Sequence, residues 1–137
     1  MGNALRYLGI ARMSGNIEIG EDNAKALVKA GKARLLLVAA DASDGAKRRA
    51  EGYVFGFSTP LIEVPYTKAE IAQAVGRPGC SMAAVRDLGL ADSFVKALSA
   101  EHGGSFTALA EQLDARLERA KARRTGGAKT GNGRKRE

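Results

Sequence analysis

The side chains that most often carry out enzyme chemistry are rare in this chain. His102 is its only histidine and precedes two glycines, a position more typical of a loop residue than of a general base. Cys80 is its only cysteine, and no neighbouring residue suggests the base that a thiol nucleophile needs, so a small loop thiol or buried thiol is the simpler interpretation. One histidine and one cysteine are too few for a metal site of nitrogen or sulfur ligands. We therefore expect no catalytic residue, no metal and no cofactor.

The stretch after Gly20 is the more promising binding feature. The sequence contains neither Gly-x4-Gly-Lys-Ser/Thr nor Gly-x-Gly-x-x-Gly, the motifs that cradle nucleotide phosphates. Gly20 lets the backbone approach a ligand closely, and the start of the helix expected after it offers free N–H groups to phosphates or bases. Lys25 and Lys29 are four residues apart and share a helix face, and Lys32 lies just beyond. The alternative interpretation is an ordinary solvated helix face.

Positive charge is concentrated at the C-terminus. The chain has 137 residues and a formal net charge of +7. Residues 114–137 contain nine basic and three acidic side chains, whereas residues 1–113 contain 13 basic and 12 acidic side chains. This excess favours a polyanionic partner, of which nucleic acid is the first candidate.

Membrane and secreted classes are disfavoured by the sequence. No stretch approaches the roughly 20 uncharged apolar residues of a transmembrane helix. The first residues lack the basic patch and apolar core of a signal peptide, and a single cysteine suits a reducing compartment. We expect a cytoplasmic protein without a membrane partner.

Hydrophobic periodicity and turn residues predict alternating helices and strands. Helices are expected over about 3–13, 21–30, 44–57, 68–75, 88–101 and 105–124, and strands over about 16–20, 35–40, 61–65 and 81–86. The continuous apolar run at 35–40 predicts a central strand covered on both faces, and 81–86 is expected at or near an edge. Asp41 or Ser43, Thr67 with Glu70, and Asp87 are the expected helix caps.

Alternation of strands and helices predicts the α/β class, as a three-layer α/β/α sandwich with a four-stranded mixed sheet. Residues 1–104 would form this domain, and 105–124 an amphipathic basic helix with an apolar stripe. The stripe is formed by Phe106, Leu109, Leu113 and Leu117. Residues 125–137 are expected to be a disordered basic tail, because their one apolar side chain is Ala128. That tail is either an arm that follows phosphates or a solubilising extension.

Six segments, taken in order, are similar to a known pattern. They are Leu8–Gly15, Ile19–Gly20, Lys25–Ala33, Leu35–Ser43, Ile71–Gly76 and Ala83–Val85. Together they resemble the bacterial YlxQ-type members of the ribosomal protein L-seven-Ae superfamily, the kink-turn RNA binders, over roughly residues 4–101. The resemblance implies an α/β/α sandwich, cytoplasmic residence, no cofactor, and association with RNA or the ribosome.

The resemblance also implies which residues contact RNA. In that family the helix after the glycine commonly opens with Asn-Glu, which reads sheared G·A pairs, and has a basic residue three places later. The corresponding positions here are Asp22, Asn23 and Ala26, so Lys25 or Lys29 would supply the positive charge from a neighbouring angle. The loop from Arg77 to Met82 takes the place of the family's second RNA-contacting loop. The predicted RNA site is formed by Gly20, Asp22, Asn23, Lys25, Lys29, Lys32, Arg77, Pro78, Gly79, Cys80 and Ser81.

The leading hypothesis is a non-enzymatic RNA-binding protein that associates with ribosomal or other structured RNA. One alternative is a protein-interaction module that docks a partner through the final helix, for which an exposed apolar stripe at Phe106, Leu109, Leu113 and Leu117 would be evidence. A second alternative is a domain of an RNA-modifying enzyme that acts without its catalytic half.

Overall fold

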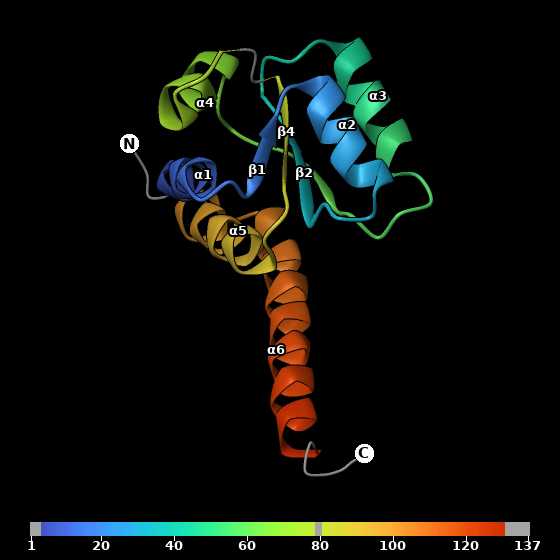
Figure 1. Cartoon of the computed structure of the whole chain (residues 1–137). Coiled ribbons are helices and arrows are strands. Elements are labelled where there is room, and N and C mark those ends of the chain that lie inside the picture. Colours follow the sequence, from blue (N-terminus) through green and yellow to red (C-terminus); the bar gives the residue numbers. More distant parts are fainter. Residues whose placement is uncertain (1–3, 79–80, 131–137) are drawn as a thin grey trace.

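The computed structural model describes residues 4–78 and 81–130, with side chains up to Arg123, and its elements follow the expected order (Figure 1). The helices are α1 (Ala4–Met13), α2 (Glu21–Lys29), α3 (Asp44–Val54), α4 (Lys68–Val75), α5 (Leu88–His102) and α6 (Phe106–Thr130). The strands are β1 (Ile17–Ile19), β2 (Leu35–Val38), β3 (Leu61–Glu63) and β4 (Met82–Val85).

The four strands form one mixed sheet in the order β1-β4-β2-β3. Strands β2 and β3 are parallel, and β4 pairs antiparallel with both β1 and β2. Helices α1, α4 and α5 and the beginning of α6 cover one face, while α2 and α3 cover the other (Figure 1). The predicted three-layer α/β/α sandwich is therefore confirmed.

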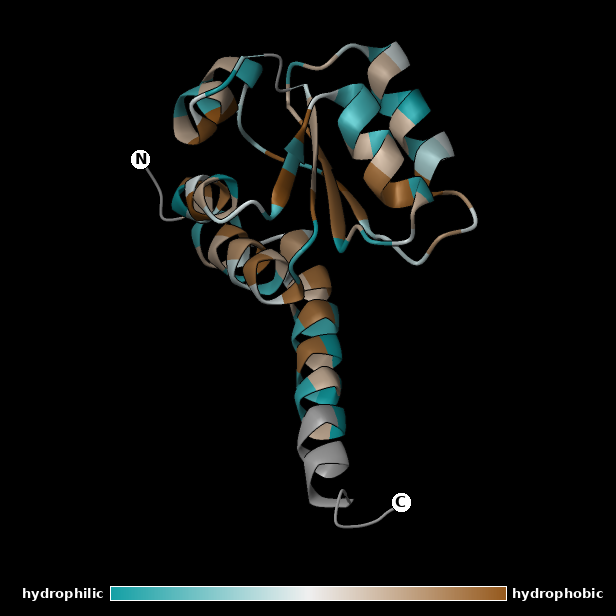
Figure 2. Ribbon diagram, in the orientation of Figure 1, coloured by the Kyte–Doolittle hydropathy of each residue, from teal (hydrophilic) through white to brown (hydrophobic). Residues whose placement is uncertain are grey.

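Strand β2 has the central position that its continuous apolar run predicted. All four of its residues are buried, because the sheet is covered on both faces. Leu35 and Leu37 pack into the core on the α1, α4 and α5 side, whereas Leu36 and Val38 pack beneath α2 and α3. Figure 2 shows the same division, with hydrophobic strands between helices whose outer surfaces are hydrophilic.

Strand β4 is an inner strand next to the edge strand β1, so it lies near an edge of the sheet but not at one. It lies between β1 and β2, and each of its residues is at most 1% exposed. Ala83 faces the core beneath α1 and α5, while Ala84 faces the core beneath α2. The short alanine side chains suit a strand with helices close to both faces, although in sequence they give a weaker apolar signal than the leucines of β2.

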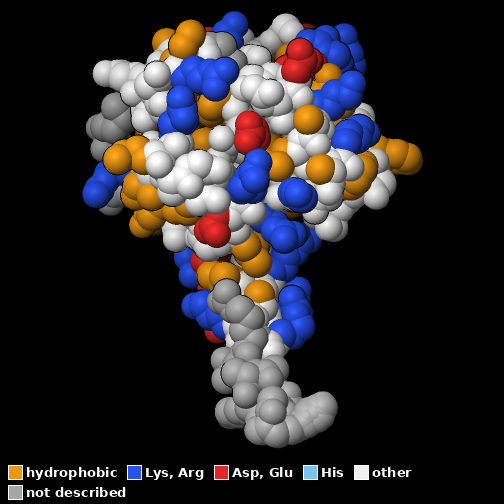
Figure 3. Space-filling view, viewed as in Figure 1, with side chains coloured by type: hydrophobic (Ala, Val, Ile, Leu, Met, Phe, Trp, Pro, Cys, Tyr) orange, Lys and Arg blue, Asp and Glu red, His pale blue; other side chains and the backbone are white. Residues whose placement is uncertain are grey.

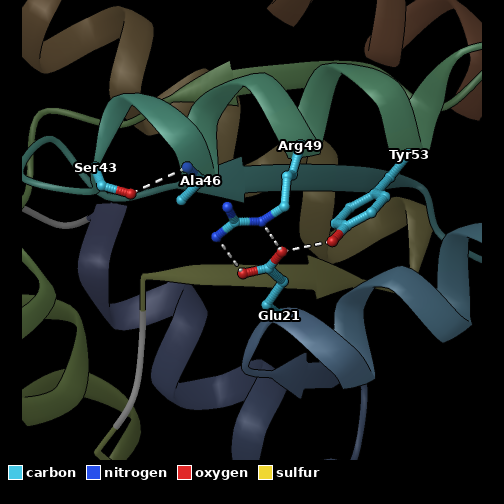
Figure 4. Close-up of polar contacts among 5 residues, drawn as sticks. All are labelled: Glu21, Ser43, Ala46, Arg49 and Tyr53. Carbon is cyan, nitrogen blue, oxygen red and sulfur yellow. Dashed lines mark hydrogen bonds and ion pairs between the residues drawn. The ribbon is translucent and has the colours of Figure 1, made fainter.

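Three helices carry side-chain caps that the sequence predicted, and α2 carries none. Ser43 Oγ accepts from the Ala46 N–H at 3.0 Å (Figure 4), and Asp87 caps α5 through the Leu90 N–H at 2.9 Å. Thr67 and its partner at position 70 form the expected capping box of α4. The N-cap of α2 is Gly20, which has no side chain to accept a bond. The first-turn N–H groups of α2 therefore stay open to an external acceptor.

Helix α6 is longer than the sequence predicted. It ends at Thr130 instead of residue 124, and so includes Gly126 and Gly127. Each glycine disfavours a helix by about 1 kcal/mol relative to alanine, but each still donates a backbone N–H, and a formed helix propagates at one hydrogen bond per residue. The disordered tail expected over 125–137 is thus helical up to 130, and residues 131–137 lie outside the described part of the chain.

The first half of α6 packs on the body, and the second half projects away from it (Figure 1). Leu113 is fully buried and Ala110 is 7% exposed. Phe106 and Leu109 are half-buried against the same core, and Leu117 is half-buried. The apolar stripe is therefore covered largely by the protein itself, which removes the observation that would have favoured a protein-interaction module.

A three-residue ion cluster reinforces the contact between α5 and α6. Asp92 on α5 is only 3% exposed. Lys96 Nζ lies 3.2 Å from its Oδ2 and 2.8 Å from Asp114 Oδ1 on α6. The hydrogen bonds to Asp114 and then to Asp92 raise the pKa of Lys96 above its ordinary value. The Lys96 ammonium thus pairs with the buried Asp92 carboxylate and also links α5 to α6.

Replacing that cation should destabilise the protein. Lys96→Met leaves the carboxylate of Asp92 buried without its positive partner, so we expect the free energy of unfolding to fall by about 1–3 kcal/mol. Lys121→Met is the matched control, because Lys121 makes only an exposed contact of 3.8 Å with Glu118, and should cost less than about 0.5 kcal/mol. Denaturant titration measures both variants, and equal losses would contradict a structural role for the cluster.

Candidate nucleic-acid interface

Gly20 joins three elements at one end of the sheet. It ends β1, starts α2, and donates its N–H to the carbonyl of Met82 in β4 at 2.9 Å. Its backbone has φ 99° and ψ 156°, a conformation that is essentially restricted to glycine. Gly20 therefore has a structural role at the contact with β4, and its predicted approach to a ligand stays a prediction.

The predicted second loop lies beside this junction. Helix α4 ends at Gly76, whose φ of 71° turns the chain into the loop, and the Arg77 N–H donates to the Ala72 carbonyl at 3.2 Å. At the other end of the loop, the Ser81 carbonyl accepts from the Ala39 N–H at 2.9 Å, next to the Met82 carbonyl that holds Gly20. Both ends are therefore fixed, and the second is adjacent to the start of α2. Arg77 and Pro78 are exposed and Ser81 is half-buried; the predicted site residues Gly79 and Cys80 lie outside the described part.

Asp22 and Asn23 occupy the exposed first turn of α2. Asn23 is held by its own side chain, because Nδ2 donates to the Ile19 carbonyl at 2.9 Å. With Nδ2 engaged in this way, Oδ1 is the side-chain atom that can accept from a ligand. The carboxylate of Asp22 can accept as well, so this turn presents two side-chain acceptors beside open backbone donors.

Lys25 and Lys29 point along a different side of α2. Lys25 Nζ lies 5.4 Å from the centre of the Tyr53 ring on α3, and Lys29 Nζ lies 5.2 Å from the centre of the Phe57 ring. Such cation–π contacts contribute about 0.5–1 kcal/mol each at exposed sites. Both lysines are exposed, and they form a basic and aromatic ridge along α2 and α3 instead of facing the loop after α4.

The opposite side of α2 borders a shallow groove of about 270 Å³. Its lining includes Asn23, Ala26, Ala30 and Lys32 from α2 and the residues after it, and Arg86 from the end of β4. Ala26 therefore lines the groove, at the position where the resemblance implies a basic residue. Lys32 is the predicted lysine that shares this groove with Asn23.

Glu21 is the residue at the start of α2 that the sequence did not mark as part of a cluster. Its carboxylate accepts from Arg49 Nε at 2.6 Å and from Arg49 Nη2 at 3.0 Å, and the Tyr53 hydroxyl donates to it at 2.5 Å (Figure 4). The Arg49 hydrogen bonds, followed by the Tyr53 bond, lower the pKa of Glu21 to about 2. The cluster ties α2 to α3 and pairs the negative charge nearest to Gly20. A carboxylate 28 residues from its arginine gives no local sequence signal.

His102 has a packing role. Its ring lies between Tyr66 and Phe106, with ring centres 5.8 Å and 6.5 Å away, and its Nε2 is 3.4 Å from the Tyr66 hydroxyl. Burial, followed by the neighbouring Glu101 charge, raises the pKa of Tyr66 to about 12.

Across residues 4–78 and 81–130, no cluster of His, Cys, Asp and Glu is arranged to hold a metal ion. Within the same residues, no helix has both the length and the apolar character for a membrane span.

Two solved structures share this architecture. A protein of unknown function from Bacillus halodurans superposes with a TM-score of 0.67 at 19% identity, over 72% of this chain and 99% of that one. A 15.5 kD RNA-binding protein of Giardia lamblia superposes with a TM-score of 0.58 at 18% identity, over 70% of this chain and 82% of that one. The chain thus shares its α/β/α fold with both proteins.

Comparison of sequences is more specific. The RNA-binding protein YlxQ of Enterococcus faecium is 31% identical over 75 residues, which span 55% of this chain and 72% of that protein. No family model matches the chain. On this identity and coverage, the chain belongs to the YlxQ family, as its ordered sequence segments predicted.

A pair of glycine substitutions tests the backbone constraint at the β1–α2 junction. A Cβ at Gly20 would meet no atom within 4 Å, so the cost of Gly20→Ala comes from its positive φ and should be about 1–3 kcal/mol of unfolding free energy. Gly52→Ala, in the exposed part of α3 with equally open space, should instead stabilise by about 0.5–1 kcal/mol. Denaturant unfolding reports both, and effects of the same sign would contradict this account.

The Glu21 cluster predicts a pH-dependent component of stability. The folded pKa of about 2 lies below the ordinary value of 4.5, so ionised Glu21 favours the folded state above pH 4.5, and this contribution is lost as pH falls from 4.5 towards 2. We expect Glu21→Gln to cost about 1 kcal/mol at pH 7, allowing for solvent screening of a partly exposed pair, and close to nothing near pH 2.

The control is Glu51→Gln, which removes an exposed carboxylate on α3. Urea titrations of the two variants and the unsubstituted protein between pH 2 and 7 give the comparison. A stability difference for Glu21→Gln that stays constant across this range would contradict the proposed pairing.

Proposed function

We propose that this protein is a non-enzymatic binder of structured RNA, and that the first turn of α2 and the loop from Arg77 to Ser81 form its recognition surface. The observation that carries the proposal is the hydrogen bond from the Gly20 N–H to the Met82 carbonyl, which holds these two segments side by side. The family relationship supports it, since the YlxQ relative is named an RNA-binding protein.

The chemistry of the first turn of α2 suits the edges and phosphates of RNA. Backbone N–H groups without a side-chain cap can donate to anionic or carbonyl oxygens. Asp22 and Asn23 add acceptors, which the amino group and ring N–H of guanine require. Because Arg49 and Tyr53 hold the Glu21 carboxylate, the negative charge next to this turn is already paired before an RNA approaches.

The kink-turn is the RNA motif that this arrangement fits. Sheared G·A pairs present donors in the minor groove, and Asn23, with Nδ2 bound to the Ile19 carbonyl, presents Oδ1 as an acceptor. The loop after α4 would contact the flipped-out base on the other side. Ribosomal RNA is rich in such structured elements, so the proposal includes association with the ribosome. It also includes a cytoplasmic location and binding without a cofactor.

Substitution of Asn23 tests the specific form of the proposal. Asn23→Ala removes the side-chain acceptor, so affinity for a kink-turn RNA should fall about tenfold or more, while affinity for a straight duplex of equal length should stay unchanged. Asn16→Ala is the matched control, because it makes the same change at the opposite end of β1 and should alter neither affinity. Fluorescence anisotropy titration measures the constants. Equal affinity of the unsubstituted protein for both RNAs would refute kink-turn recognition.

A further inference from the structure

A second hollow of about 560 Å³, open to solvent, lies where α6 leaves the body, and arginines dominate its lining. Arg34 precedes β2 and Arg86 follows β4, while Arg116, Arg119 and Arg123 come from α6. Spacings of three and four residues place the α6 arginines on one side of that helix, facing the end of the sheet. Figure 3 shows basic side chains gathering along α6 and on the adjoining part of the body.

Two contacts give this arginine cleft a defined shape. Arg116 Nη2 donates to the Ser58 carbonyl at 3.3 Å, and the α5–α6 packing holds the first half of α6 in place. Ala120 lies among the α6 arginines and is short, so the space between helix and sheet stays open. The cleft is therefore built by the packing of α6 and is not a chance cluster on a mobile arm.

Most of the arginines in the cleft have no carboxylate partner within the part of the chain that the structure describes. Arg86 pairs with Glu18 at 2.9 Å, whereas the other four arginines contact no carboxylate among the described residues. Asp87 also lines the cleft, but its carboxylate caps α5 through the Leu90 N–H. Arginine presents planar donors that match phosphate oxygens, so phosphate is the group that this surface suits.

The cleft and the groove along α2 meet at one residue. Arg86 lines both hollows, and Asn23 lies at the other end of the groove, beyond Ala26 and Ala30. Arg86, which follows β4, is four residues from Met82 at the start of that strand, which corresponds to roughly 13 Å along extended chain. Glu18 also lines the groove, where it pairs with Arg86. A nucleic-acid stem that starts at the first turn of α2 can therefore pass Ala26 and Ala30 to reach the arginines.

We propose that the arginine cleft binds the sugar–phosphate backbone of an RNA stem that extends from the recognition surface at the start of α2. This inference rests on the proposed function, and adds to it a second contact region that reads no sequence. The cleft is open, and its lining includes five arginines and no aromatic side chain, so it suits backbone phosphates better than a stacked base. Helix α6 is then a part of the binding surface, positioned by the body.

The test compares two variants that lose the same charge. The cleft variant carries Arg34→Gln, Arg119→Gln and Arg123→Gln, which spares the two arginines that bond to Ser58 and Glu18 and so preserves the fold. The control variant carries Arg6→Gln, Arg12→Gln and Arg48→Gln, all exposed on α1 or α3. Each variant is titrated with a kink-turn RNA whose stem has either about 4 or about 12 base pairs, and with a straight duplex of the longer length. Thermal unfolding confirms that both variants are folded.

We expect the unsubstituted protein and the control variant to bind the long-stem RNA more tightly than the short-stem RNA, and the cleft variant to lose this advantage. Its affinity for the long-stem RNA should fall about tenfold, and the slope of log K against log salt should become shallower by about 2–3 units, since three phosphate contacts are lost. Equal losses in both variants would overturn the inference, because net charge alone would explain them. Unchanged RNA binding in the cleft variant would also overturn it, and would leave the cleft to an acidic protein or a small anion.

Failure of the proposed function gives a different pattern. If the protein does not distinguish the kink-turn from the straight duplex, but the cleft variant still loses affinity for both long RNAs, kink-turn recognition is refuted while the arginine cleft stands as a phosphate-binding surface. If Asn23→Ala weakens kink-turn binding and the cleft variant binds like the control, the function stands and the cleft is refuted.

Discussion

The hydrogen bond from the Gly20 N–H to the Met82 carbonyl joins the two segments that form the proposed binding surface. It connects the edge strand β1, the central strand β4 and the first turn of α2, and it can form because Gly20 adopts a positive φ. A side chain at this position would strain the turn, and a capping residue would occupy the N–H groups that are left open. The loop that precedes β4 ends beside this hydrogen bond. The bond therefore links the first turn of α2 to that loop.

Charge is arranged differently at the two ends of β4. At the α2 end, Arg49 and Tyr53 pair the Glu21 carboxylate, and the exposed groups include the side-chain acceptors of Asp22 and Asn23 beside open backbone N–H groups. At the opposite end, arginines from the sheet and from α6 line a cleft in which most of them lack a carboxylate partner among the described residues. Directional contacts confer specificity, whereas phosphate contacts confer affinity that depends on salt, and our proposal assigns these two kinds of contact to separate ends of β4. Arg86 lines both the cleft and the groove along α2.

Local features could be predicted from the sequence, and long-range ones could not. Spacing and residue type within a few turns predict the helix caps at Ser43, Thr67 and Asp87. They also predict the buried strand β2 and the sandwich class. The central place of β4 depends on helices packing against its alanines from both faces, which no local pattern reveals. Residue spacing correctly placed Lys25 and Lys29 on one face of α2. Only the structure shows that this face lies against Tyr53 and Phe57, and not towards the loop after α4. Counting charges separately for the body and the C-terminus likewise could not predict that arginines from both parts line one cleft.

Backbone amide chemical shifts measured by NMR during titration with a kink-turn RNA test the central claim most directly, because they report on the open N–H groups themselves. The account predicts that the largest changes occur at Glu21, Asp22 and Asn23, and at Arg77 and Ser81, with smaller changes along the α2 groove and α6. Changes confined to α6 and the adjoining arginines, with the amides at the start of α2 unaffected at saturation, would contradict it.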